Sequence, residues 1–139
     1  MKKMKSNNWK KVEYKVAKML GGMRVPVSGR SETIKGDVAH KKYFIEVKSG
    51  KQIPKWVFKT YEKKKKEIEK KGYIVIKEKM PKTILKWWEG VVGGAGGKKP
   101  ILVMKPRYAH NEFVIYKKDK EIRFTTLKKF VENEAKNII

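Results

Sequence analysis

One short stretch, residues 36–48, constrains the fold of this chain more than any other. It reads Gly-Asp-Val-Ala-His-Lys-Lys-Tyr-Phe-Ile-Glu-Val-Lys, and its second half has the strict alternation of a β-strand. Successive side chains of a strand point to opposite sides of a sheet. The pattern therefore predicts a tight antiparallel hairpin. The two faces of its second strand carry Tyr43, Ile45 and Val47 on one side and Phe44, Glu46 and Lys48 on the other.

This hairpin would set two carboxylates against each other. If the chain reverses at Lys41-Lys42, Asp37 lies directly across from Glu46. Opposed side chains on one face have Cβ atoms about 5 Å apart, and like charges at that separation repel unless a cation lies between them. A divalent metal is the obvious cation. Lys48, on the same face as Glu46, supplies a second positive charge.

The overall charge points to a polyanionic partner. The chain has 139 residues, of which 40% are hydrophobic, so it is long enough for one globular domain with a real core. Lys and Arg number 37 against 14 Asp and Glu, a formal net charge of +23. A compact domain tolerates such self-repulsion more easily beside a polyanion, and nucleic acid is a better candidate than an anionic membrane surface. A lysine-rich surface that is merely solvated is the alternative.

Cysteine usage and hydropathy indicate in which cellular compartment the protein is expected. The chain contains no cysteine, which excludes disulfides, thiolate zinc sites and a cysteine nucleophile, and fits a reducing compartment. The basic first residues are not followed by the apolar run of a signal peptide, and no uninterrupted apolar stretch is long enough to span a bilayer. We expect an intracellular, cytoplasmic protein with no membrane partner, in the host cell if the source is a virus.

The rest of the chain predicts a single mixed α/β domain over residues 1–139, with one mixed sheet flanked by helices. Helices are expected over residues 6–20, from Pro54 to about Lys71, briefly around residues 84–88, and after Thr125 or Thr126. Strands are expected over residues 23–27, 33–39, 73–76, 101–104 and 113–116. The glycine-rich segment 90–97 predicts a flexible loop within an insertion that spans about 80–99.

Glu13 interrupts the apolar stripe of the first predicted helix. It lies four residues after Trp9 and three before Val16, on or beside the face that would be buried. A carboxylate in that position must be paired or must point into a polar site. Glu13 is therefore either a flanking residue that forms a salt bridge with a lysine or a further member of the hairpin site.

These residue types suit metal-assisted cleavage of a phosphodiester. Mg²⁺ takes hard oxygen ligands and keeps several waters, so the carboxylates of Asp37 and Glu46 with the carbonyl of Val47 would suffice. Lys48 would stabilise charge in the transition state or orient the attacking water. Glu13 would hold a second metal or a metal-bound water. An exposed cross-strand ion pair is the non-catalytic interpretation of the Glu-X-Lys pattern.

Asp37, Glu46-Val47-Lys48 and Glu13 on a preceding helix together resemble the PD-(D/E)xK nuclease superfamily. More closely, Gly29-Arg30-Ser31, the strand Ile45-Glu46-Val47-Lys48-Ser49 and the basic helix after it resemble the archaeal-type Holliday junction resolvases, viral members included. The resemblance covers most of the chain apart from residues 80–99. The acidic-lysine motif is shared by many nucleases, whereas Gly-Arg-Ser narrows the choice. Gly36 replaces the proline of the motif, which removes no ligand.

The resemblance implies a restriction-endonuclease-like core and a Mg²⁺- or Mn²⁺-dependent homodimer. Such an enzyme resolves four-way (Holliday) DNA junctions by paired nicking, in DNA recombination and repair. The implied catalytic residues are Glu13, Asp37, Glu46, Lys48 and Ser31, and the implied metal ligands are Asp37, Glu46, Val47 and Glu13. Basic residues near these motifs are expected to contact the nucleic acid, namely Arg30, Lys35, Lys51 and Lys55.

Two alternatives remain open. The first is a metal-dependent endonuclease of the same fold that acts on flaps, ordinary duplex or RNA. The second is a non-catalytic, basic nucleic-acid-binding protein, in which Glu46 and Lys48 only pair across a strand and Trp87 and Trp88 stack on bases.

The two histidines, His40 and His110, lack a partner at metal-ligand spacing and are expected in turns or on the surface.

Overall fold

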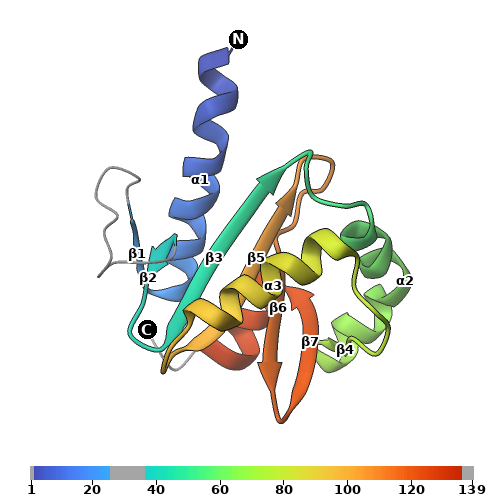
Figure 1. Cartoon of the computed structure of the whole chain (residues 1–139). Helices are drawn as coiled ribbons and strands as arrows, with labels where there is room; N and C mark the ends of the chain where they lie inside the picture. The colour runs from blue at the N-terminus through green and yellow to red at the C-terminus, as the bar shows by residue number, and fades with distance from the viewer. Residues whose placement is uncertain (1, 26–36, 136–139) are drawn as a thin grey trace.

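The computed structural model describes residues 2–25 and 37–135, which form one mixed sheet with helices on both faces (Figure 1). The strands are β1 (Met23–Arg24), β2 (Val38–Ala39), β3 (Tyr43–Gly50), β4 (Ile74–Val75), β5 (Lys99–Pro106), β6 (Phe113–Lys118) and β7 (Glu121–Thr126). The helices are α1 (Lys2–Leu20), α2 (Trp56–Lys71), α3 (Lys82–Gly94) and α4 (Leu127–Phe130), and α4 continues as a π-helix over Val131–Ala135. The predicted α/β class with one mixed sheet is confirmed.

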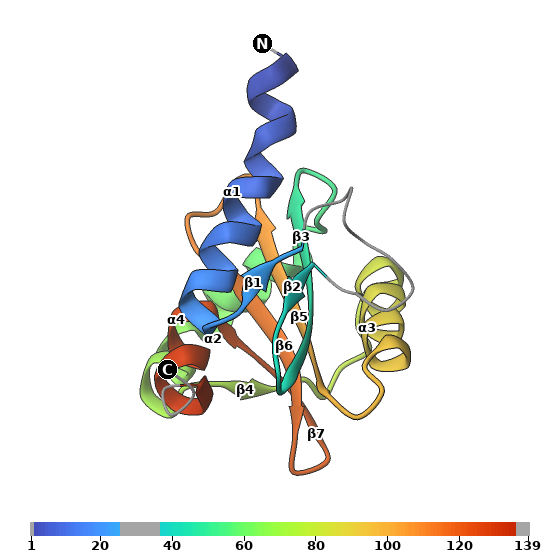
Figure 2. The ribbon, with the colours of Figure 1, turned by 90° about the vertical axis from the view of Figure 1, so that its left-hand side faces the viewer.

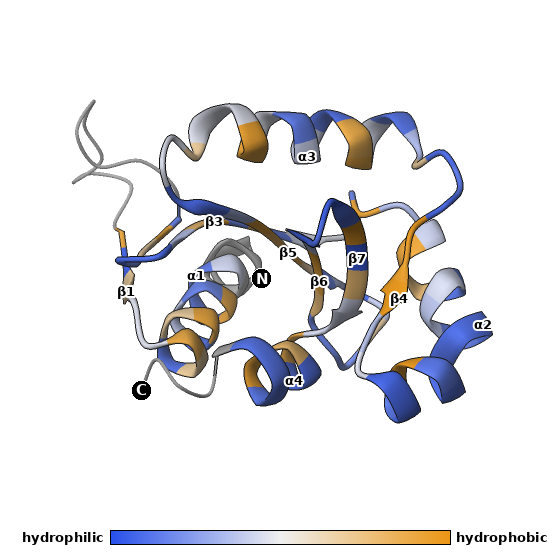
Figure 3. Ribbon diagram, turned by 90° about the horizontal axis from the view of Figure 1, so that it is seen from below, coloured by the Kyte–Doolittle hydropathy of each residue, from blue (hydrophilic) through white to orange (hydrophobic). Residues whose placement is uncertain are grey.

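The sheet has seven strands in the order β1-β2-β3-β5-β6-β7-β4. Strands β3 and β5 are parallel, and every other neighbouring pair is antiparallel. The chain leaves β3, forms α2, β4 and α3, and returns as β5 beside β3. Helix α3 of this crossover covers one face of the sheet, while α1 and α4 cover the other, as Figures 2 and 3 show. Helix α2 lies beside β4 at the edge of the molecule (Figure 3).

The alternation of β3 divides its side chains between two apolar clusters. Tyr43, Ile45 and Val47 pack with residues of α1 and α4. Phe44 packs with residues of α2 and α3 on the opposite face. The predicted face assignment of this strand is therefore confirmed, and it leaves Glu46 and Lys48, both half-buried, on the same face as Phe44.

Gly72 ends α2 where the sequence predicts. Its φ of 91° lies in the left-handed region, and its N–H donates to the carbonyl of Ile68 over 2.8 Å. This is the usual termination of a helix by glycine. A β-carbon at this position would also displace the end of the Asn133 side chain, but it is the positive φ that favours glycine here.

The predicted flexible loop over residues 90–97 is wrong for residues 90–94, which continue α3 to Gly94. Glycine costs about 1 kcal/mol relative to alanine inside a helix. Burial outweighs that cost, because Trp88 and Val91 of α3 belong to the core on the Phe44 face. Gly94 also permits close packing, since a β-carbon there would lie 2.9 Å from Cζ of Phe44.

Several other elements differ from the prediction in their bounds, and three of the differences are larger than the rest. Helix α1 begins at Lys2 and not at residue 6. Strand β2 covers only Val38–Ala39 of the predicted strand over 33–39. Asp37 is not part of a strand, and residues 33–36 lie outside the described residues. Strand β7, over Glu121–Thr126, was not predicted at all. The helix after it is capped as predicted, because the Thr126 hydroxyl accepts from the N–H of Lys129 over 3.2 Å.

None of the helices described here is both long enough and apolar enough to cross a lipid bilayer.

Candidate active site

The pairing of β2 with β3 sets the geometry of the candidate site. Val38 pairs with Ile45, and Asp37 directly precedes β2. The N–H of Asp37 donates to the carbonyl of Ile45 over 3.0 Å. Its carboxylate Oδ2 accepts from the N–H of Val47 over 2.6 Å. The side chain of Asp37 is thus fixed against the main chain of the Glu46-Val47-Lys48 segment.

Lys48 lies under α3, on the face of β3 that also carries Glu46. Its ammonium nitrogen is 5.5 Å from the centre of the Trp87 ring, within the range of a cation–π contact. Trp88, the next residue of α3, is only 5% exposed and belongs to the core. The two tryptophans therefore have different roles, and Trp87 is the one that contacts a candidate site residue.

Glu13 comes from α1, which covers the face of the sheet opposite the one that carries Glu46 and Lys48. Its Oε1 is 2.9 Å from Nε of Arg24 on β1, and the two side chains are only 5% and 8% exposed. The guanidinium carbon of Arg24 also lies 5.2 Å from the Trp9 ring centre and 5.3 Å from that of Tyr14. Arg24 pairs across the sheet with Val38, the neighbour of Asp37. Arg24 was not among the predicted site residues, because nothing in a two-residue strand indicates that its side chain turns toward α1.

The oxygen donors at the hairpin suit a hard divalent cation. Among the side chains described, no group of three or more His, Cys, Asp or Glu residues could hold a metal ion. The predicted ligand set at the hairpin consists of the carboxylates of Asp37 and Glu46 and the carbonyl of Val47. Mg²⁺ is commonly bound through one or two carboxylates and keeps several waters, so this donor set fits it.

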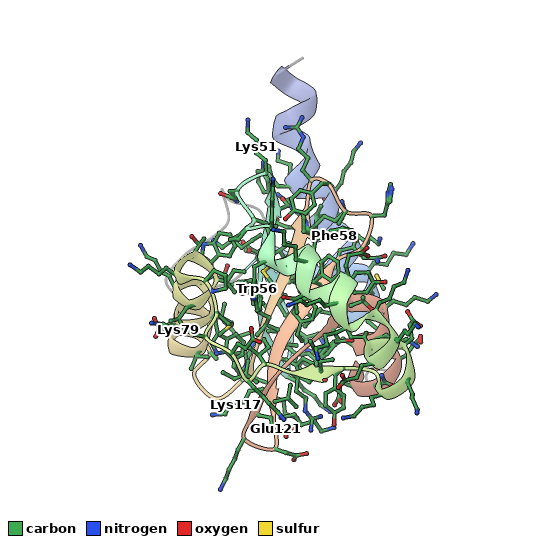
Figure 4. The ribbon with its side chains drawn as sticks, turned by 90° about the vertical axis from the view of Figure 1, so that its right-hand side faces the viewer. Lys51, Trp56, Phe58, Lys79, Lys117 and Glu121 are labelled. Carbon is green, nitrogen blue, oxygen red and sulfur yellow. The ribbon has the colours of Figure 1, made fainter. Side chains whose placement is uncertain are left out.

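The remaining predicted site residues are distributed as follows. Lys51 is exposed just after the end of β3 (Figure 4), and Lys55 is exposed immediately before α2. Arg30, Ser31 and Lys35 lie outside the described residues, so their proposed roles stay predictions.

His40 organises the turn between β2 and β3. Its Nε2 donates to the carbonyl of Leu20 over 2.9 Å, while Nδ1 accepts from the N–H groups of Lys42 (3.0 Å) and Tyr43 (3.3 Å). Burial lowers the pKa of His40 below its ordinary value of 6.5, and the nearby ammonium groups of Lys98 and Lys42 lower it further. The hydrogen bond to Leu20 acts in the opposite direction. His40 is a turn residue, as expected, but it is 7% exposed and not on the surface.

A scan against protein-family models, a search of curated proteins and a search of solved structures each give no match. The function of this chain therefore has to be inferred from its own residues and geometry.

Proposed function

We propose that this chain is a Mg²⁺-dependent endonuclease that nicks branched DNA, with four-way junctions as its first candidate substrate. One observation supports this more than any other. The carboxylate of Asp37 is hydrogen-bonded to the main chain of Val47, between Glu46 and Lys48. Asp37, Glu46 and Lys48 would supply the two carboxylates and the lysine that metal-assisted phosphodiester cleavage needs.

Each residue of the hairpin has a distinct task in this proposal. Asp37 and Glu46, with the carbonyl of Val47, would hold the metal ion. When bound, the ion neutralises charge on the phosphate and lowers the pKa of a bound water. Lys48 would place its ammonium group beside the phosphate oxygens, where negative charge builds up during the reaction.

The hydrogen bond from Val47 contributes preorganisation. It fixes the orientation of the Asp37 carboxylate before any ligand arrives, as outer hydrogen bonds commonly do for metal ligands. Arg24 would do the same for Glu13, because its guanidinium holds that carboxylate over 2.9 Å in a nearly dry environment. The role of Glu13 in holding a second metal or a metal-bound water is carried over from the sequence resemblance.

The choice of DNA rests on charge, and the choice of junctions rests on the sequence resemblance. A net charge of +23 favours a polyanionic substrate. The Gly29-Arg30-Ser31 motif and the Ile45–Ser49 strand resemble those of junction resolvases. By the same resemblance, two copies of the chain would act together and nick two strands in a paired manner.

The test compares a mobile four-way junction with a linear duplex of the same sequence. We expect nicking of the junction in Mg²⁺, at least about tenfold faster than nicking of the duplex, and no nicking in EDTA. Junction binding in EDTA should persist. Nicking in EDTA would contradict a metal mechanism, and equal rates on the two substrates would contradict junction selectivity. Binding without nicking in both Mg²⁺ and Mn²⁺ would identify a non-catalytic nucleic-acid-binding protein.

A further inference from the structure

A groove of about 760 Å³ lies between α2 and the segment formed by β4 and residues 76–78. Figure 3 shows α2 and β4 side by side at one edge of the molecule. The volume falls within the range of about 300–1,000 Å³ that is typical of ligand sites. Nothing in the candidate active site uses this groove.

The rim of the groove is cationic. Four lysines line it, and they face a single acidic lining residue, Glu78. All four lysines are exposed, and within the described part of the chain none of them forms a salt bridge with a carboxylate. Three of them come from one face of α2 and the fourth follows β4. They are Lys59, Lys63, Lys64 and Lys77.

The floor of the groove is apolar. Trp56, at the start of α2, lines it together with Val75 and Ile76. The Trp56 ring is held edge-on against Phe124, with the ring centres 6.1 Å apart and an interplanar angle of 77°. Figure 4 looks onto α2 and labels Trp56 at its beginning. The indole is half-buried, so it is fixed in place and still contributes surface to the groove.

A cationic rim over an aromatic and aliphatic floor matches an unpaired nucleic-acid strand. In such sites lysines follow the phosphates while bases stack on aromatic rings or pack on apolar side chains. A paired duplex would contact only the rim, because its bases are turned inward and its outer surface is charged. An unpaired strand can place phosphates on the lysines and bases on the floor at the same time.

The groove lies at the far edge of the sheet from the hairpin. In the strand order, β4 is four positions from β3, which corresponds to roughly 19 Å at a spacing of about 4.8 Å between strands. A branched DNA that is nicked at β3 therefore has room to extend a second segment toward α2.

We propose that the groove between α2 and β4 is a second nucleic-acid site that binds an unpaired DNA strand. It rests on the proposed function for the choice of DNA as the ligand. It also narrows the substrate class, because the preferred DNA would carry an unpaired segment next to the branch.

A matched pair of double variants on α2 tests the site. Lys59→Gln/Lys63→Gln removes two lysines that line the groove. Lys66→Gln/Lys70→Gln removes two exposed lysines with the same spacing, on the same helix, that do not line it. Binding of a fluorescent oligothymidylate is measured by anisotropy in EDTA, over a range of salt concentrations.

We expect the groove variant to bind oligothymidylate about tenfold more weakly at low salt. Its plot of log affinity against log salt concentration should be shallower by about 1.4, since each single-strand phosphate contact contributes about 0.7. The control variant should change affinity less than about twofold. Equal weakening in both variants would mean that the attraction is spread over the whole surface, and would overturn the proposal.

Two competitors test the kind of ligand. An abasic strand of the same length keeps every phosphate and lacks the bases, and we expect the wild type to bind it at least about fivefold more weakly. Equal binding would overturn the role of the floor. Polyglutamate of equal charge should compete poorly, and effective competition would identify a general anion or acidic-protein site.

These measurements are independent of cleavage. If the nicking assay fails while the groove variant behaves as expected, the nuclease proposal falls and the strand-binding site stands. If nicking is observed and the matched variants behave alike, the nuclease proposal stands and the strand-binding site falls.

Discussion

At the scale of single residues, the hairpin between β2 and β3 is organised by two buried polar side chains that accept hydrogen bonds from the main chain. Asp37 accepts from the N–H of Val47, and His40 accepts from the N–H groups of Lys42 and Tyr43. Both residues are 7% exposed. Buried N–H groups are costly to leave unpaired, so each of these residues contributes to the shape of the hairpin as well as to its chemistry.

The hydrogen bond of Asp37 predicts different effects of two substitutions on stability. Asp37→Ala leaves the N–H of Val47 without this acceptor and should lower the free energy of unfolding by about 1–3 kcal/mol. Asp37→Asn keeps an oxygen that can accept from Val47, and should change it by less than about 1 kcal/mol. Urea denaturation measures both. Equal losses in the two variants would show that the charge, and not the hydrogen bond, stabilises the hairpin.

Lys48 tests the electrostatic part of the proposed mechanism. Lys48→Ala should slow junction nicking by about 100-fold or more, the usual cost of losing one group that stabilises transition-state charge. Junction affinity in EDTA should change by no more than about threefold, since one charge of many is lost. Single-turnover nicking and anisotropy give the two numbers. A large loss of affinity with an unchanged nicking rate would assign Lys48 to binding instead.

The lowered pKa of His40 predicts how the stability of the protein depends on pH. Because burial lowers this pKa in the folded state, the unfolded chain takes up a proton first as the pH falls below 6.5. The free energy of unfolding should therefore decrease as the pH falls through this window. His40→Gln should lose less stability than the wild type between pH 7 and pH 5. His110→Gln, at an exposed position, should follow the wild type, and identical behaviour of all three proteins would contradict the prediction.

At the scale of elements, local sequence patterns predicted a helix or strand feature correctly where a single pattern dominated the segment. The alternation in β3, the glycine after α2 and the threonine before α4 each predicted a feature that the structure has. Strand β7 was missed because its polar residues hide the alternation of Ile122 and Phe124, and because the turn before it lacks the usual glycine signal. In α3, tertiary packing overrides the glycine content of the segment. The contact between Glu13 and Arg24 depends on how α1 packs against β1, which no local pattern encodes.

The turn between β6 and β7 stores strain that a substitution can remove. Asp119 and Lys120 both have positive φ, 53° and 65°, a combination that favours glycine or asparagine in a two-residue hairpin. Lys120→Gly should raise the free energy of unfolding by about 0.5–1 kcal/mol, because the left-handed conformation costs about 1–2 kcal/mol in non-glycine residues. Lys117→Gly, in the neighbouring strand, should lower it by about 0.5–1 kcal/mol. Thermal denaturation of the two variants should shift in opposite directions, and a shared direction would contradict this account of the turn.

At the scale of the whole molecule, the two proposed sites differ in chemistry and lie toward opposite edges of the sheet. The hairpin site on β2 and β3 offers carboxylates and one lysine, while the groove at the β4 edge offers lysines and an aromatic floor. The chain that carries both has a formal net charge of +23. Affinity for DNA should therefore be general and strongly salt-dependent, whereas cleavage should depend on a few residues of the hairpin.

The proposed metal site at Asp37 is tested by nicking of a four-way junction in Mg²⁺ with two variants, Asp37→Asn and Asp119→Asn. Both variants replace one aspartate with asparagine, and Asp119 lies in the turn between β6 and β7, away from β3 in the strand order. We expect Asp37→Asn to bind the junction like the wild type and to lose nicking by at least about 100-fold, while Asp119→Asn nicks at the wild-type rate. Wild-type nicking by Asp37→Asn would contradict the proposed metal site.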